Sequence, residues 1–184
     1  MNSHALRRFE TFLATPGLPS LGPNPRPGRE PLAELNRTVD EAFRETGIDA
    51  VKQLLIRSLL LLWHDHLEES HSLSQEIHDA DGSVLHGIMH RREPDYWNAK
   101  YWFNRVGDHP AFPFIAERTS KLLTSLGEDT LAKELVPDGK WNPGAFVDAC
   151  ERAAKLNSSL VATLQRIQEI EFQVLLEQFC EKTP

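Results

Sequence analysis

The most apolar run of the chain constrains the fold more than any other feature of the sequence. It extends from Leu54 to Trp63 and contains Arg57. The run is about ten residues long, whereas a helix that spans a bilayer needs roughly 20 apolar residues. It therefore predicts a helix buried in the core of a domain that does not span a membrane.

The rest of the sequence also favours helices. Apolar residues recur at helical spacing, and no run shows the alternation and β-branched enrichment typical of strands. We therefore predict an all-α, single-domain helical bundle over residues 1–184, with an irregular central segment. Helices are expected over residues 5–13, from Pro31 to Gly47, from a cap at Asp49 through Ile77, on both sides of Glu93-Pro94, and over 112–126, 128–135, 143–156 and 158–179.

A proline-rich segment interrupts this pattern near the N-terminus. Residues 16–31 hold six prolines and three glycines. Proline removes an amide donor and fixes φ, so this segment is expected to be extended or turning. We predict a strap that lies across the surface of the domain.

Composition limits the partners and the cellular location. The net charge of −7 does not suit a nucleic-acid binder, which usually presents a basic face. The N-terminus lacks the apolar core of a secretory signal, so a cytoplasmic location is expected by default. The two cysteines, Cys150 and Cys180, are then expected to be buried free thiols. Neither nucleic acid nor a membrane is expected as a partner.

The helix expected over 158–179 bears on the oligomeric state. Its apolar residues cover a wide arc that includes Leu164, Ile167 and Phe172. Such an arc is typical of a helix in the middle of a bundle, and it also suits a homodimer interface. A core helix is the preferred interpretation.

Histidines and acids concentrate in one part of the chain. Six of the eight histidines lie between His64 and His90, and residues 64–95 hold eight acidic residues against two arginines. That segment therefore carries most of the net charge. Imidazoles and carboxylates together form the ligand set of several divalent metals.

On one continuous helix, His64, Glu68, His71 and Gln75 would form a polar stripe. His64 and His71 lie two turns apart, about 10.5 Å, so they are not expected to share an ion. His66 falls on the apolar face and is expected to be a hydrogen-bonded core residue. "EESH" has the Glu-x-x-His form of di-iron sites, but no second such unit is present.

A second cluster, "HGIMH", places His86 and His90 at i,i+4, so both imidazoles face the same way on a helix. The signal "DADGS" at 79–83 predicts a turn that could fold this pair against Glu68 and His71. These four side chains would make an adequate first coordination shell for Zn, Fe or Mn. A metal-free ligand pocket and a solvated polar face stay open as alternatives.

The segment from His90 to Phe112 is rich in aromatic and basic residues. This composition suggests a pocket with apolar walls and a few fixed polar groups. Its arginines could bind a carboxylate or phosphate of a ligand, or could pair with Glu93, Asp95 and Asp108. Asp108 is also a candidate helix cap. The candidate substrate-binding residues are Arg91, Arg92, Trp97, Tyr101 and Arg105.

The chain lacks several well-defined catalytic motifs. It has no P-loop, no Rossmann glycine fingerprint, no Gly-x-Ser-x-Gly and no Cys-x-x-Cys. "LLLLWHDHLEESHSLSQEI" and "HGIMHRREPDYWNAKYWFNRVGDHPAF", within residues 59–112, resemble a group of bacterial and fungal proteins. The resemblance implies no established activity, cofactor or catalytic residue. It indicates that this block is the working part of the chain.

Together, these observations predict a metal-dependent enzyme or a metal-assisted binder of a small anionic molecule. Glu68, His71, His86 and His90 would hold the ion, and His64 would act as a general base or as a partner of the ligands. A metal-free binding module and a helical dimerising protein are the alternatives.

Overall fold

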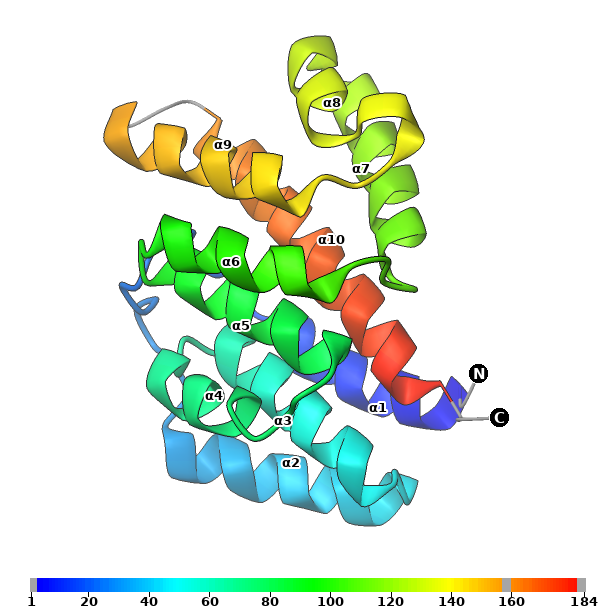
Figure 1. The fold of residues 1–184 in the computed structure, drawn as a ribbon. Coiled ribbons are helices and arrows are strands. Elements are labelled where there is room, and N and C mark those ends of the chain that lie inside the picture. The colour runs from blue at the N-terminus through cyan, green and yellow to red at the C-terminus, as the bar shows by residue number, and fades with distance from the viewer. Residues whose placement is uncertain (1–2, 157–159, 182–184) are drawn as a thin grey trace.

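A computed structural model describes residues 3–156 and 160–181, and within them all regular structure is helical (Figure 1). The predicted all-α fold is confirmed. The α-helices are α1 (Ser3–Leu13), α2 (Leu32–Thr46), α3 (Ala50–Trp63), α4 (Leu67–Ser74), α5 (Ala80–Arg92), α6 (Tyr96–Val106), α7 (Phe112–Leu126), α8 (Asp129–Leu135), α9 (Pro143–Leu156) and α10 (Val161–Cys180). A short 3-10 helix, η1, spans Pro137–Gly139.

Helix α10 runs through the middle of the bundle (Figure 1). It packs against α1, α3, α7 and α9, and Leu164, Ile167 and Phe172 are fully buried. The preferred interpretation of this helix as a core element is therefore confirmed. Residues 158–159 of the predicted helix lie outside the described residues.

The prediction of one helix from Asp49 through Ile77 is wrong. Asp49 caps α3 by accepting a hydrogen bond from Lys52 N, but α3 ends at Trp63 and α4 begins at Leu67. Between them Asp65 has a φ of 65°, a left-handed conformation that a helix cannot contain. The break turns α4 away from the axis of α3.

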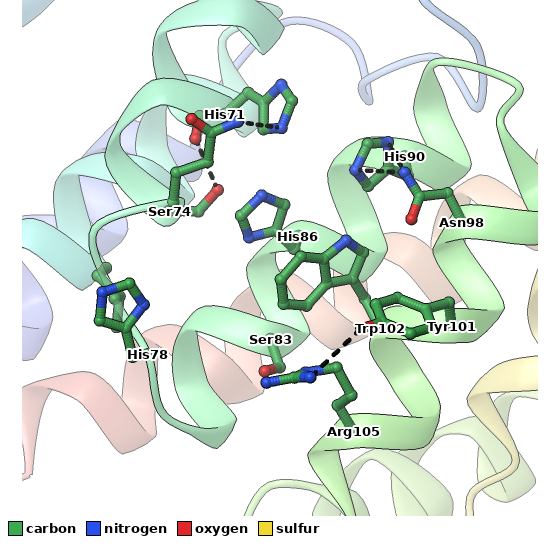
Figure 2. Close-up of a pocket in the computed structure, with 12 residues that line it drawn as sticks. His71, Ser74, His78, Ser83, His86, His90, Asn98, Tyr101, Trp102 and Arg105 are labelled. Carbon is green, nitrogen blue, oxygen red and sulfur yellow. Dashed lines mark hydrogen bonds between the residues drawn. The ribbon is translucent and has the colours of Figure 1, made fainter.

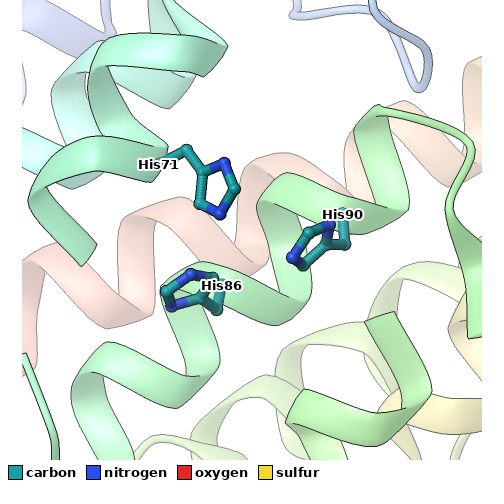
Figure 3. Close-up of side chains that lie close together, drawn as sticks. All are labelled: His71, His86 and His90. Atoms are coloured by element: carbon teal, nitrogen blue, oxygen red, sulfur yellow. The ribbon is translucent and has the colours of Figure 1, made fainter. Parts of the chain in front are cut away.

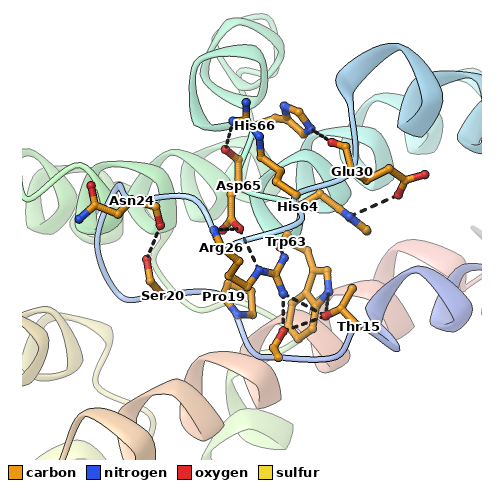
Figure 4. Close-up of polar contacts among 12 residues, drawn as sticks. Thr15, Pro19, Ser20, Asn24, Arg26, Glu30, Trp63, His64, Asp65 and His66 are labelled. Atoms are coloured by element: carbon orange, nitrogen blue, oxygen red, sulfur yellow. Dashed lines mark hydrogen bonds and ion pairs between the residues drawn. The ribbon is translucent and has the colours of Figure 1, made fainter.

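The proline-rich strap holds this break in place (Figure 4). Backbone N and Nε of Arg26 both donate to Asp65 Oδ2, at 3.0 and 2.8 Å. The strap also contacts α10, where Gln165 and Gln168 donate to the carbonyl oxygen of Pro19. The segment contains no helix over residues 16–31, as its prolines predict.

Two local predictions are also wrong. Residues 80–83 form the first turn of α5 instead of a loop, because Asp79 caps this helix by accepting from Gly82 N. Asp108 does not cap α7, which follows Ala111 and has no side-chain cap. The predicted break at Glu93-Pro94 does separate α5 from α6.

Two further expectations concern membrane-spanning helices and the two cysteines. No helix in residues 3–156 and 160–181 is long and apolar enough to span a membrane. Cys150 and Cys180 are buried free thiols, and burial raises the pKa of each to about 12.

Candidate metal centre

A tight helical hairpin between α4 and α5 builds the candidate site. Its turn closes through hydrogen bonds from Glu76 N to Leu73 O and from Ile77 N to Ser74 O. A Cβ on Gly82 would lie only 2.2 Å from Ile77 O, so the return of the chain requires glycine at this position. The hairpin therefore sets α4 against α5.

This arrangement brings together three imidazoles, those of His71 from α4 and of His86 and His90 from α5 (Figure 3). One ligand atom from each lies within 4.8 Å of the other two. The ring of His71 is nearly perpendicular to those of His86 and His90, with centroids 5.0 and 5.1 Å away. Three imidazoles that converge from two helices could hold one metal ion.

Burial keeps the two imidazoles of α5 neutral. His86 and His90 are 2% and 6% exposed. Burial, with the neighbouring imidazoles, lowers the pKa of His86 to about 4, and it lowers the pKa of His90 as well. A neutral imidazole has a lone pair for a metal. Nδ1 of His86 is buried and has no hydrogen-bond partner in the described structure.

Polar side chains next to the imidazoles position the other two rings. Gln75 Nε2 lies 2.9 Å from His71 Nε2, and Asn98 Nδ2 lies 3.1 Å from His90 Nε2. Because an amide nitrogen only donates, both ring nitrogens accept. Asn98 Nδ2 also lies 3.4 Å from His90 Nδ1, and this second ring nitrogen lies 3.7 Å from Glu93 Oε2. Such outer partners orient metal-binding histidines in many proteins.

A pocket of about 430 Å³ opens in front of the three imidazoles (Figure 2). One wall is Trp102, whose indole stacks on His86 with centroids 4.1 Å apart. This volume falls in the range of small-molecule sites. The remaining lining residues, besides the triad, are Ser74, Gln75, Ile77, His78, Ser83, Asn98, Tyr101 and Arg105.

Tyr101 and Arg105 are the predicted substrate-binding residues that line this pocket, whereas Trp97 does not. Arg105 Nη1 donates to Tyr101 Oη at 3.3 Å. Trp97 is 76% exposed, and its indole stacks on the ring of Tyr101 with centroids 6.2 Å apart. Glu68, predicted as a fourth ligand, is exposed and lies outside both the triad and the pocket lining.

The structure does not bring Arg91 and Arg92 to the pocket, because both are fully buried elsewhere. Arg91 binds the carboxylate of Glu171 at 2.6 Å and lies over the ring of Phe146. Arg92 binds Asp65 Oδ1 at 2.6 Å. Their carboxylate partners are therefore distant in sequence and differ from the expected Glu93, Asp95 and Asp108.

His64 and His66 also lie apart from the triad, beside the strap (Figure 4). His64 Nε2 donates to Phe12 O at 3.0 Å, and the ring lines a separate pocket under the strap. Burial lowers its pKa to about 4. His66 Nε2 donates to Glu30 O at 2.9 Å and is 3% exposed, which confirms the expected hydrogen-bonded core residue.

The sequence-based prediction placed Gln75 on the polar stripe without giving it a role, and it did not assign Asn98 and Trp102 to the site. The spacing in the sequence could have indicated Asn98 and Trp102. Together with Arg105 they are spaced at i, i+4 and i+7, which places the three side chains on one face of α6. Once α6 is paired with α5, that face covers the His86/His90 pair. The pairing of the two helices was the missing information.

No family model matches the chain, and neither a curated protein nor a solved structure shows significant similarity to it. The resemblance of residues 59–112 to a bacterial and fungal group therefore stays a prediction.

Proposed function

We propose that this protein binds one divalent transition-metal ion through His71, His86 and His90, and that it works as a metal-dependent enzyme or a metal-assisted binder of a small molecule. The observation that carries the proposal is the convergence of three ring nitrogens within 4.8 Å. The pocket beside them gives a ligand access to the ion.

The donor set fits some ions better than others. Imidazole suits zinc and iron, whereas manganese prefers oxygen ligands. Of the three predicted metals, zinc and iron are therefore favoured. Tetrahedral zinc at 2.0–2.1 Å from each nitrogen needs nitrogens about 3.3 Å apart. Since the ring nitrogens now lie within 4.8 Å of one another, a bound zinc ion would require the rings to rotate toward it, and the half-buried His71 has the most freedom to do so.

Three protein ligands leave at least one coordination position open, which is typical of catalytic zinc sites. A bound divalent ion would polarise an oxygen of the ligand or lower the pKa of a bound water. The amides of Gln75 and Asn98 now occupy two ring nitrogens. An ion that takes their place would leave both amides free to contact its other ligands.

The test is metal binding by protein purified without a histidine tag. We expect titration with Zn²⁺ to show one ion per chain in the wild-type protein. His86→Ala and His90→Gln should each weaken binding by at least about a hundredfold, since each removes one of three ligands. Circular dichroism checks that the variants are folded.

Two control variants make this test specific. His78→Ala removes an exposed imidazole of the same pocket that is outside the triad, and Glu68→Gln removes the carboxylate that the sequence suggested. Both should bind zinc as the wild type does. If zinc does not bind, or if His78→Ala weakens binding as much as His86→Ala, the metal centre is contradicted and a metal-free pocket becomes the better interpretation.

A further inference from the structure

The charges around the pocket bear on the class of ligand, on the condition that the proposed metal binds. Among the described residues, none of the side chains that line the pocket is acidic. Glu93 and Asp95 lie 3.7 and 3.9 Å from His90 Nδ1 but are outside the lining. An ion held by three neutral imidazoles would therefore keep its full double positive charge toward the ligand.

Arg105 adds another positive charge at the mouth of the pocket. Within the described part of the chain it has no carboxylate partner, and its one hydrogen bond goes to Tyr101 Oη. This distinguishes it from Arg91 and Arg92, whose guanidinium groups are paired with buried acids. The donors of Arg105 that Tyr101 leaves free can bind an oxyanion in a bidentate manner.

Trp102 fixes the relation between the two positive groups. Its indole stacks on His86 at 4.1 Å, and the guanidinium carbon of Arg105 lies 5.4 Å from the centre of the same indole. The same indole therefore contacts a ring of the triad and the guanidinium of Arg105. The triad and Arg105 line one pocket, so a molecule bound in it could contact both (Figure 2).

We propose that the ligand is a small dianion with an oxyanion at each end, one on the metal held by His71, His86 and His90 and the other on Arg105 and Tyr101. This inference rests on the proposed metal centre and names the substrate class for it. Arg105 is exposed, so it would bind a simple anion weakly. A ligand held at both ends binds more tightly because its second contact is intramolecular.

Cobalt-loaded protein tests this directly, since the visible spectrum of bound Co²⁺ reports any oxyanion that enters its coordination shell. The probes are acetate and the straight-chain dicarboxylates from oxalate to adipate, with phosphonoacetate to compare a phosphonate with a carboxylate. We expect one chain length to bind at least about tenfold more tightly than acetate. A preference for phosphonoacetate over malonate that disappears in Arg105→Gln would assign a phosphate-type group to Arg105, and a preference that persists in this variant would place the phosphonate on the metal.

Variants separate the two ends of the ligand. Arg105→Gln should abolish the advantage of the dicarboxylate and leave acetate binding unchanged. Lys100→Gln is the matched control, because Lys100 is on the same helix, outside the pocket, and binds Asp148. It should keep the wild-type behaviour. Tyr101→Phe should give an intermediate loss.

The outcomes distinguish this inference from the metal centre itself. If Co²⁺ fails to bind, the proposed function fails first. If Co²⁺ binds but no dicarboxylate exceeds acetate, or if Arg105→Gln behaves like Lys100→Gln, the metal centre stands and the two-ended ligand is overturned.

Discussion

The imidazole of His86 lies against the indole of Trp102 with ring planes only 11° from parallel. The two side chains come from α5 and α6, so the stack joins a candidate metal ligand to the helix that forms the pocket wall. The orientation of His86 therefore depends on a residue that cannot itself bind a metal.

The first prediction concerns this stack. Trp102→Leu should leave the fold intact but free the His86 ring, and it should weaken zinc binding by about ten- to hundredfold, as loss of outer partners commonly does. Trp97→Leu is the control, because Trp97 is largely exposed and contacts Tyr101 instead. Competition with a chromophoric chelator measures both affinities. Equal zinc affinities for the two variants would argue against a positioning role.

The second prediction concerns the close contact of α5 with α6 at Gly87. A Cβ at this position would lie 2.8 Å from the ring of Phe103. Gly87→Ala should therefore destabilise the protein by about 1–3 kcal/mol through overpacking. Urea unfolding measures the change in free energy.

Two further variants check this cause. Phe103→Leu combined with Gly87→Ala should recover part of the stability lost in the single variant. Gly144→Ala should not destabilise, since a Cβ there meets only Asn142 Oδ1 at an ordinary 3.5 Å. Full stability of Gly87→Ala would show that the helices can separate without cost.

The third prediction concerns the buried ion pair of Arg91 with Glu171. Glu171→Gln leaves the Arg91 guanidinium buried without its carboxylate, which should cost about 3–5 kcal/mol of unfolding free energy. Glu134→Gln breaks the more exposed pair with Arg152 and should cost less than about 1 kcal/mol. Similar losses in the two variants, measured by urea unfolding, would contradict the structural role of Arg91.

The fourth prediction concerns acid. His64 has a pKa of about 4 in the folded protein, below its usual 6.5. As the pH falls, His64 therefore takes up its proton in the unfolded chain at a higher pH than in the folded protein. Stability is therefore complete above pH 6.5 and is lost progressively toward pH 4. The loss from His64 alone would reach about 3 kcal/mol. The pKa of His86 is lowered to a similar value and adds to the effect.

Urea unfolding in the presence of EDTA, at a series of pH values, checks this dependence. His64→Gln cannot take up the proton, so its stability should fall less steeply between pH 6.5 and 4. The part due to His86 should persist in that variant. A slope identical to that of the wild type would mean that His64 is not held neutral by the fold.

Short-range spacing explains which site residues the sequence could predict. His86 and His90 share a face at i,i+4, and the chain does turn back before them so that His71 meets this pair, but the turn lies between Ser74 and Ala80 and not at the predicted residues 79–83. Glu68 shares α4 with His71 but is exposed and outside the triad. His64 was assigned to the face of His71 on the assumption of one continuous helix. The left-handed conformation of Asp65 removes that assumption, and it depends on ion pairs that no local pattern contains.

The arginines illustrate the same limit. Arg91 and Arg92 stand beside the site in sequence, yet their partners Glu171 and Asp65 are 80 and 27 residues away. The contact of Arg91 with Glu171 of α10 and the α3–α4 break at Asp65 bury these guanidinium groups, and neither contact is visible in the local sequence. Arg105, on the exposed face of α6, needed no distant partner and was predicted to be at the pocket.

The shared carboxylate of Asp65 has a mechanical consequence. One of its oxygens is bound by Arg26 of the strap and the other by Arg92, which is two residues from His90. A displacement of the N-terminal segment would thus be transmitted to the imidazole pair through a single side chain. Proteolytic cleavage within residues 16–31 would therefore be expected to loosen the packing of His86 and His90, which the cut segment does not contact.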